Sequence, residues 1–120
     1  MDRTFLLLGA VAAFLAVTLG AFAAHGLRGR LSPEMMAVFQ TGVQYHMYHA
    51  LALILVSAIM GRMSGWLIQA AGWSFVAGIV LFSGSLYWLA LSGVVILGAV
   101  TPIGGLAFLV GWACLAFAAF

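Results

Sequence analysis

Three histidines are the residues of this chain best suited to chemistry. His46 and His49 lie three residues apart in the stretch YHMYH at 45–49, and His25 precedes them. On a helix, residues i and i+3 share a face, so both imidazoles can offer a nitrogen to one ion. Three nitrogen ligands with an open position suit a catalytic zinc or a copper ion. A metal, haem or quinone contact built from His25, His46 and His49 is therefore one hypothesis, although the identity of any metal stays unknown.

The same histidines have two other interpretations. The H-E-x-x-H spacing of zinc proteases is absent, and Glu34 is the only carboxylate near them in the sequence. Imidazole and phenol side chains combine an apolar body with a polar tip, which suits the headgroup level of a membrane. We therefore favour anchoring at the membrane surface and hydrogen bonding between helices, with proton transfer as the third interpretation.

Composition identifies the solvent that must position these residues. The chain has 120 residues, of which 67% are hydrophobic and 5% charged, whereas soluble domains carry about 25% charged residues. Lipid must therefore surround most of the protein. The net charge of +2 comes from four scattered arginines, so no basic cluster is available to hold nucleic acid. Cys114 is the only cysteine and cannot form an internal disulfide.

Four apolar runs are long enough to cross a membrane, which takes about 20 residues. They are residues 4–24, 43–60, 66–92 and 102–120. A cleaved signal peptide is an alternative interpretation of the first run, but that run exceeds the usual length of a signal core. Because backbone in lipid must satisfy its own hydrogen bonds, the spans should be helices. We predict an all-α, polytopic membrane protein with four transmembrane helices in one domain, 1–120.

The one polar linker, residues 25–39, contains a helix start. Ser32 can cap free amides, Pro33 fits the first helical position, and Glu34 suits the positive end of the helix dipole. We expect a short interfacial helix here, between the first and second transmembrane helices; the alternative is that this helix leads directly into the second span.

Small residues recur at helical spacing within the spans, where close packing rather than hydrophobic contrast must join the helices. The first and fourth spans carry the clearest stripes, namely Gly9, Ala13, Ala16, Gly20 and Ala24, and Gly104, Ala107, Gly111, Cys114 and Ala118.

Alternating spans should collect polar residues near one membrane surface. The candidate polar cluster is His25, Gln44, Tyr45, His46, His49, Tyr87 and Thr101. Within it we expect His49 to face the bundle, with a partner near Ser83, Tyr87 or Thr101, and His46 to be more exposed. The only acids, Asp2 and Glu34, lie outside the spans, which argues against proton-coupled export through a buried carboxylate.

Four phrases of the chain resemble one known family. They are GAFAAHGL at 20–27, FQTGVQYHMYHALAL at 39–53, SGSLYWLAL at 83–91 and TPIGGLAFLVGW at 101–112. The family is the small inner-membrane group catalogued as domain of unknown function 423, whose eukaryotic relatives are the transmembrane-protein-256-like proteins. The positions that match its pattern are His25, Gly26, Thr41, Gly42, Tyr45, His49, Ser83, Gly84, Thr101, Pro102, Gly104, Gly105, Gly111 and Trp112, while Ala23 replaces a glycine.

This resemblance implies a multi-pass protein of the bacterial inner membrane with four helices. It implies no established enzymatic reaction, no catalytic residue and no cofactor. The expected function is a structural, membrane-integrity or complex-associated role, and the alternative is the histidine-based site described above. The expected partners are the lipid bilayer and either a second copy or another membrane protein.

Overall fold

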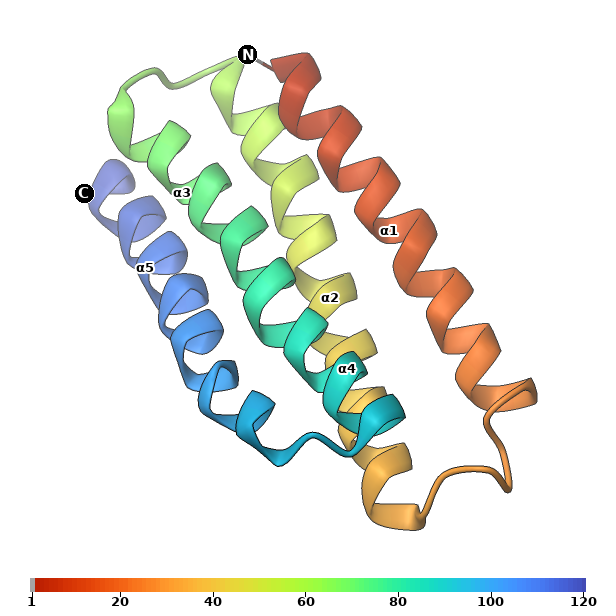
Figure 1. The fold of residues 1–120 in the computed structure, drawn as a ribbon. Coiled ribbons are helices and arrows are strands. Elements are labelled where there is room, and N and C mark those ends of the chain that lie inside the picture. The colour runs from red at the N-terminus through yellow and green to blue at the C-terminus, as the bar shows by residue number, and fades with distance from the viewer. Residues whose placement is uncertain (1) are drawn as a thin grey trace.

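Helices account for nearly all of the described chain. The computed structural model describes residues 2–120, and among these residues it contains no strand. Figure 1 shows the long helices lying side by side. In chain order the elements are α1 (Asp2–His25), α2 (Pro33–Met60), α3 (Trp66–Gly78), the π-helix η1 (Ile79–Ser83), α4 (Gly84–Ser92), the 3-10 helix η2 (Val95–Ala99) and α5 (Thr101–Ala119).

The described residues include four helical segments that are long and apolar enough to cross a membrane. They are Arg3–His25, Pro33–Met60, Trp66–Ser92 and Val95–Ala119. The predicted all-α fold with four membrane-spanning helices is therefore confirmed. The turn at 61–65 and the chain ends lie at one end of the bundle, and the linkers at 26–32 and 93–100 lie at the other (Figure 1).

The predicted interfacial helix is not present as a separate element. Its start is where we expected it, because the Ser32 hydroxyl accepts a hydrogen bond from the Met35 N–H at 3.2 Å. From Pro33, however, the helix continues without a break to Met60, which is the alternative that it leads directly into the second span. Gly42 is the one glycine within this helix, and it does not end the helix, because it is buried against the Tyr87 ring. At 1.5 Å per residue α2 is about 42 Å long, so it extends past a hydrocarbon core of about 30 Å.

A π-helical turn interrupts the third span. The N–H of Gly84 bonds to the carbonyl of Ile79, one residue beyond the α-helical partner. Neighbouring helices hold this turn in place. The Ser83 hydroxyl donates to the Gly42 carbonyl in α2 at 2.7 Å. On the other side, a Cβ on Gly104 of α5 would lie 2.6 Å from the Cα of Phe82.

Aromatic side chains and glycines interlock in the interior. One buried cluster joins all four spans through Phe5, Leu53, Phe75 and Phe108 with their neighbours. Several of these rings lie where a glycine leaves room; a Cβ on Gly111, for example, would come within 2.5 Å of the Phe75 ring. The small-residue stripe predicted for the fourth span therefore does face the bundle.

Candidate functional site

His49 lies at the centre of the interior polar contacts. Its ring stacks on Phe108 with centroids 3.5 Å apart and an angle of 8° between the planes. The Trp112 indole N–H donates to His49 Nε2 at 3.0 Å, which links α2 to α5. The other nitrogen, Nδ1, lies 2.7 Å from the Tyr45 carbonyl oxygen one turn earlier. As expected, His49 is buried and makes a polar contact with another helix, but its partner is Trp112 and none of the three residues we predicted.

These two contacts assign the protons of the imidazole. A carbonyl oxygen only accepts and an indole N–H only donates. His49 therefore carries its proton on Nδ1 and accepts at Nε2, which is the neutral form. A second proton, on Nε2, would point at the Trp112 N–H. A metal ion bound to Nε2 would displace the Trp112 N–H from that nitrogen. One nitrogen of His49 is therefore bonded to the backbone of its own helix, and the other is bonded to α5.

His46 occupies a second buried position, where we expected exposure. It is only 5% exposed, and its Nδ1 lies 2.8 Å from the Tyr87 hydroxyl. The backbone of Ala12 in α1 also hydrogen-bonds the ring. Since that carbonyl accepts from one nitrogen, the Tyr87 O–H donates to the other. His46 therefore ties α1, α2 and α4 together.

The expected position of these histidines along their helix was wrong for a physical reason. We placed them near a membrane surface because we started the second span at about residue 43. The helix starts at Pro33 instead, so His46 and His49 lie near its middle. They also face the middle of α1, where Ala12 meets His46 and Gly9 meets Ala50. A polar group at this depth needs a partner inside the protein, which explains the burial of His46.

Serine and threonine hydroxyls make the remaining hydrogen bonds between helices in the interior. The hydroxyls of Ser85 and Thr101 lie 2.6 Å apart and join α4 to α5. Among the described residues, no buried side-chain nitrogen or oxygen lacks a hydrogen-bond partner. Sequence reasoning omitted Trp112, Ser83 and Ser85 from the cluster. The signal for Trp112 was its indole N–H, a donor that needs an acceptor wherever it lies inside a span.

Of the remaining members of the predicted cluster, His25 and Gln44 do not join this interior, whereas Tyr45 lies at its edge, with its ring packed on Phe82. His25 is exposed at the end of α1, far along the helix from the Ala12 level of His46. Gln44 is exposed and donates to the Tyr48 hydroxyl at 2.7 Å, on the outside of α2. Tyr45 is 38% exposed, with its ring between His49 and Tyr48. Among residues 2–120 no three His, Cys, Asp or Glu side chains gather as a metal site would need.

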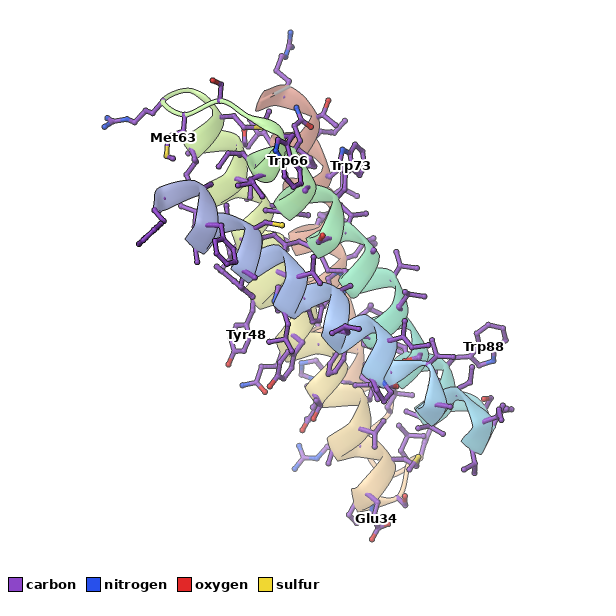
Figure 2. The ribbon with its side chains drawn as sticks, turned by 90° about the vertical axis from the view of Figure 1, so that its left-hand side faces the viewer. Glu34, Tyr48, Met63, Trp66, Trp73 and Trp88 are labelled. Atoms are coloured by element: carbon purple, nitrogen blue, oxygen red, sulfur yellow. The ribbon has the colours of Figure 1, made fainter. Side chains whose placement is uncertain are left out.

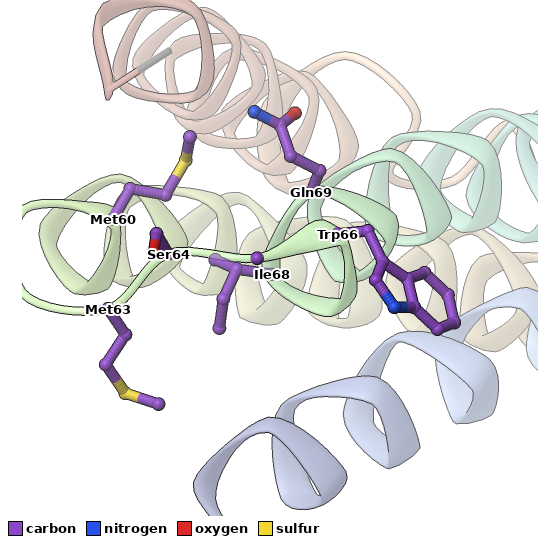
Figure 3. A pocket seen from close by; sticks show the side chains of 7 residues that line it. Met60, Met63, Ser64, Trp66, Ile68 and Gln69 are labelled. Carbon is purple, nitrogen blue, oxygen red and sulfur yellow. The ribbon is translucent and has the colours of Figure 1, made fainter.

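A surface hollow lies away from this network, at the turn between α2 and α3. It has a volume of about 380 Å³ and is lined mainly by Met60, Met63, Trp66 and Ile68 (Figure 3). Its polar side chains are Ser64 and Gln69. Neither is ionisable, so no side chain that lines this hollow could act as a base to activate the Ser64 hydroxyl.

Comparison with known proteins fits this arrangement. The family model described as "Protein of unknown function (DUF423)" matches residues 19–105, which include the histidines, the π-helical turn and Thr101. The chain belongs to this family. No solved structure matches the chain.

Two relatives show how far the similarity to DUF423 proteins extends. The "UPF0382 membrane protein YwdK" of Bacillus subtilis is 52% identical over 98% of this chain and 96% of its own length. The "UPF0382 membrane protein SERP0230" of Staphylococcus epidermidis is 49% identical over 97% of this chain and 94% of its own. Both names describe membrane proteins, which agrees with the four apolar spans.

Proposed function

We propose that this DUF423 protein is a non-catalytic, multi-pass component of the bacterial inner membrane. Its role in this proposal is structural: it acts by associating with other membrane chains, its own copies included. The observation that supports this most directly is the use of the interior polar groups. His46, His49, Ser83 and Ser85 all bond to another helix or to the backbone.

An enzyme or a proton-coupled carrier would need a different interior. Catalysis of proton transfer requires an acid or base with a free position beside the substrate. Both ring nitrogens of His49 already make hydrogen bonds. From Arg3 to the end of the described chain, the spans contain one carboxylate, Glu34, which is exposed at the start of α2. The interior therefore supports the proposal of a rigid bundle whose outer surface contacts other membrane chains.

The direct test is to isolate the protein with its surrounding lipid. Membranes are dissolved with a styrene–maleic acid polymer, and the particle is analysed by native mass spectrometry. We expect assemblies that contain more protein than one 12.6 kDa chain. The same particles are analysed for metals and by absorption spectroscopy. A single chain carrying a stoichiometric metal, haem or quinone would contradict the proposal and favour the histidine-based site.

A further inference from the structure

The outer face of α2 carries a polar stripe. Gln40, Gln44 and Tyr48 follow one another at intervals of four residues, so they lie on one side of the helix. All three are exposed, and Tyr48 is 51% exposed. In Figure 2 the Tyr48 side chain points outward from α2. Between residues 6 and 22 the large exposed side chains of α1 are, by contrast, apolar, for example Leu7, Phe14 and Val17.

Part of this stripe lies deep in the membrane. Tyr48 is about 18 Å from the Met60 end of α2 at the helical rise, which is close to the middle of a 30 Å hydrocarbon core. Gln44 lies about one turn nearer the other surface, and Gln40 lies near the boundary. Lipid tails offer these groups no hydrogen bond.

The stripe satisfies only a fraction of its hydrogen-bonding capacity internally. Gln44 donates one amide proton to Tyr48. An amide has a second proton and a carbonyl oxygen, and the phenol keeps its own proton to donate. Among the described residues Gln40 makes no side-chain hydrogen bond. Polar groups left unpaired in an apolar medium are unfavourable, so this face should be covered by something that can bond to it.

We infer that the Gln40–Gln44–Tyr48 face of α2 binds the same face of a second copy of this chain. Copies inserted with one topology are related by a two-fold axis along the membrane normal, so residues at the same depth meet their own counterparts. Such a contact requires groups that pair with themselves. Amides and phenols both donate and accept, whereas like charges would repel, and this stripe contains no charge. The inference rests on the proposed function and specifies its partner.

The surface beside the stripe allows two such helices to approach. Between α1 and α2 a groove of about 580 Å³ is lined by Gly20, Ala37, Gln40 and Gln44 among others. On the other side a groove of about 350 Å³ lies between Tyr48 and the α5 side chains Phe108 and Trp112. Small residues let helices come close in a membrane, and grooves on both sides leave room for the side chains of the second copy.

Disulfide crosslinking tests which residues meet. In a Cys114→Ala background, Ala37→Cys places a thiol one turn before the stripe and leaves the stripe itself intact. We expect an oxidant added to native membranes to link two copies through this residue. Leu91→Cys in α4, at the same end of the bundle and 54% exposed, is the matched control and should not link. Equal linking at both positions would mean random collision and would overturn the inference.

A second measurement removes the bonding groups. Gln44→Leu combined with Tyr48→Phe should weaken association in liposomes about tenfold, the value of roughly two interhelical hydrogen bonds. Gln69→Leu in α3 removes an exposed amide elsewhere and should change nothing. An unchanged dimer fraction in the double variant would overturn the inference. Assemblies that contain a different protein and no second copy would also overturn it while leaving the proposed function intact, and single chains throughout would overturn both.

Discussion

At the residue scale, two histidines of similar appearance in the sequence join different pairs of helices. His49 contacts α5 through Trp112, and His46 contacts α4 through Tyr87. The sequence correctly predicted that His49 would face the bundle, because a deep polar group needs a partner. It did not predict the burial of His46, since the two residues are three apart and only the position of α1 shows that both sides of α2 are covered.

The bond between Trp112 and His49 can be tested by removing its donor. Trp112→Phe keeps an aromatic ring but leaves His49 Nε2 without a partner in an apolar setting. We expect a loss of about 1 to 3 kcal/mol in stability, measured by thermal unfolding in detergent. Adding His49→Phe should recover part of that loss, because the unpaired acceptor disappears. Trp88→Phe, at an exposed ring, is the control; an equal loss there would contradict the assignment.

The Tyr87 hydroxyl makes a separate prediction. Tyr87→Phe removes the proton donor to His46 Nδ1 while the ring still fills the space beside Gly42 and Phe39. We expect a loss of about 1 to 3 kcal/mol by the same measurement. Tyr48→Phe removes an exposed hydroxyl instead and should leave the stability of the isolated bundle nearly unchanged. A larger effect at Tyr48 than at Tyr87 would contradict this account.

At the element scale, the sequence predicted the helices better than their irregularities. Four apolar runs were sufficient to identify the spans, because lipid permits little except helices. The π-helical turn at Ile79–Ser83 left no local signal. It depends on residues distant in the sequence, because the Gly42 carbonyl accepts a hydrogen bond from the Ser83 hydroxyl and the missing side chain of Gly104 leaves room for the Phe82 backbone. The length of α2 was missed because polarity at residues 40–49 suggested a membrane surface, whereas these residues are part of one continuous helix.

Two adjacent glycines in α5 provide a matched test of packing against that turn. A Cβ at Gly104 would collide with the Phe82 backbone, whereas one at Gly105 would lie 3.7 Å from the edge of the Phe82 ring. Gly104→Ala should therefore lower stability by about 1 to 3 kcal/mol, because backbone must move to relieve the overlap. Gly105→Ala should be tolerated. Similar thermal midpoints for the two variants would show that α5 does not pack on the turn as described.

The close approach of α5 to α3 makes a further packing prediction. Gly111→Leu would force a branched side chain against the Phe75 ring, which lies 2.5 Å from the position of the first added carbon. We expect destabilisation of about 1 to 3 kcal/mol in detergent. Ala113→Leu adds the same side chain at an exposed position and should have little effect. An unchanged midpoint for Gly111→Leu would mean that this glycine faces lipid.

At the scale of the whole molecule, aromatic side chains indicate the position of the bilayer. Trp66 and Trp88 are 75% and 64% exposed, near opposite ends of the third span (Figure 2). At the helical rise they are about 33 Å apart, which matches the thickness of a hydrocarbon core. Tryptophan is enriched at both membrane interfaces, so these two rings fit the two headgroup levels. The α2 residues before Gln40 then lie at or beyond one interface.

The order of the four spans makes the last prediction. The turn at 61–65 lies at one end of the bundle, and the linkers at 26–32 and 93–100 lie at the other (Figure 1). Reporter domains fused after residues 30, 63, 97 and 120 should therefore alternate across the membrane. The arginines favour neither orientation, because Arg3 in the first turn of α1 and Arg62 in the 61–65 turn are balanced by Arg28 and Arg30 in the linker after α1. Two successive fusions on the same side would contradict four spans, whereas alternation in either sense would agree with them and would show the orientation.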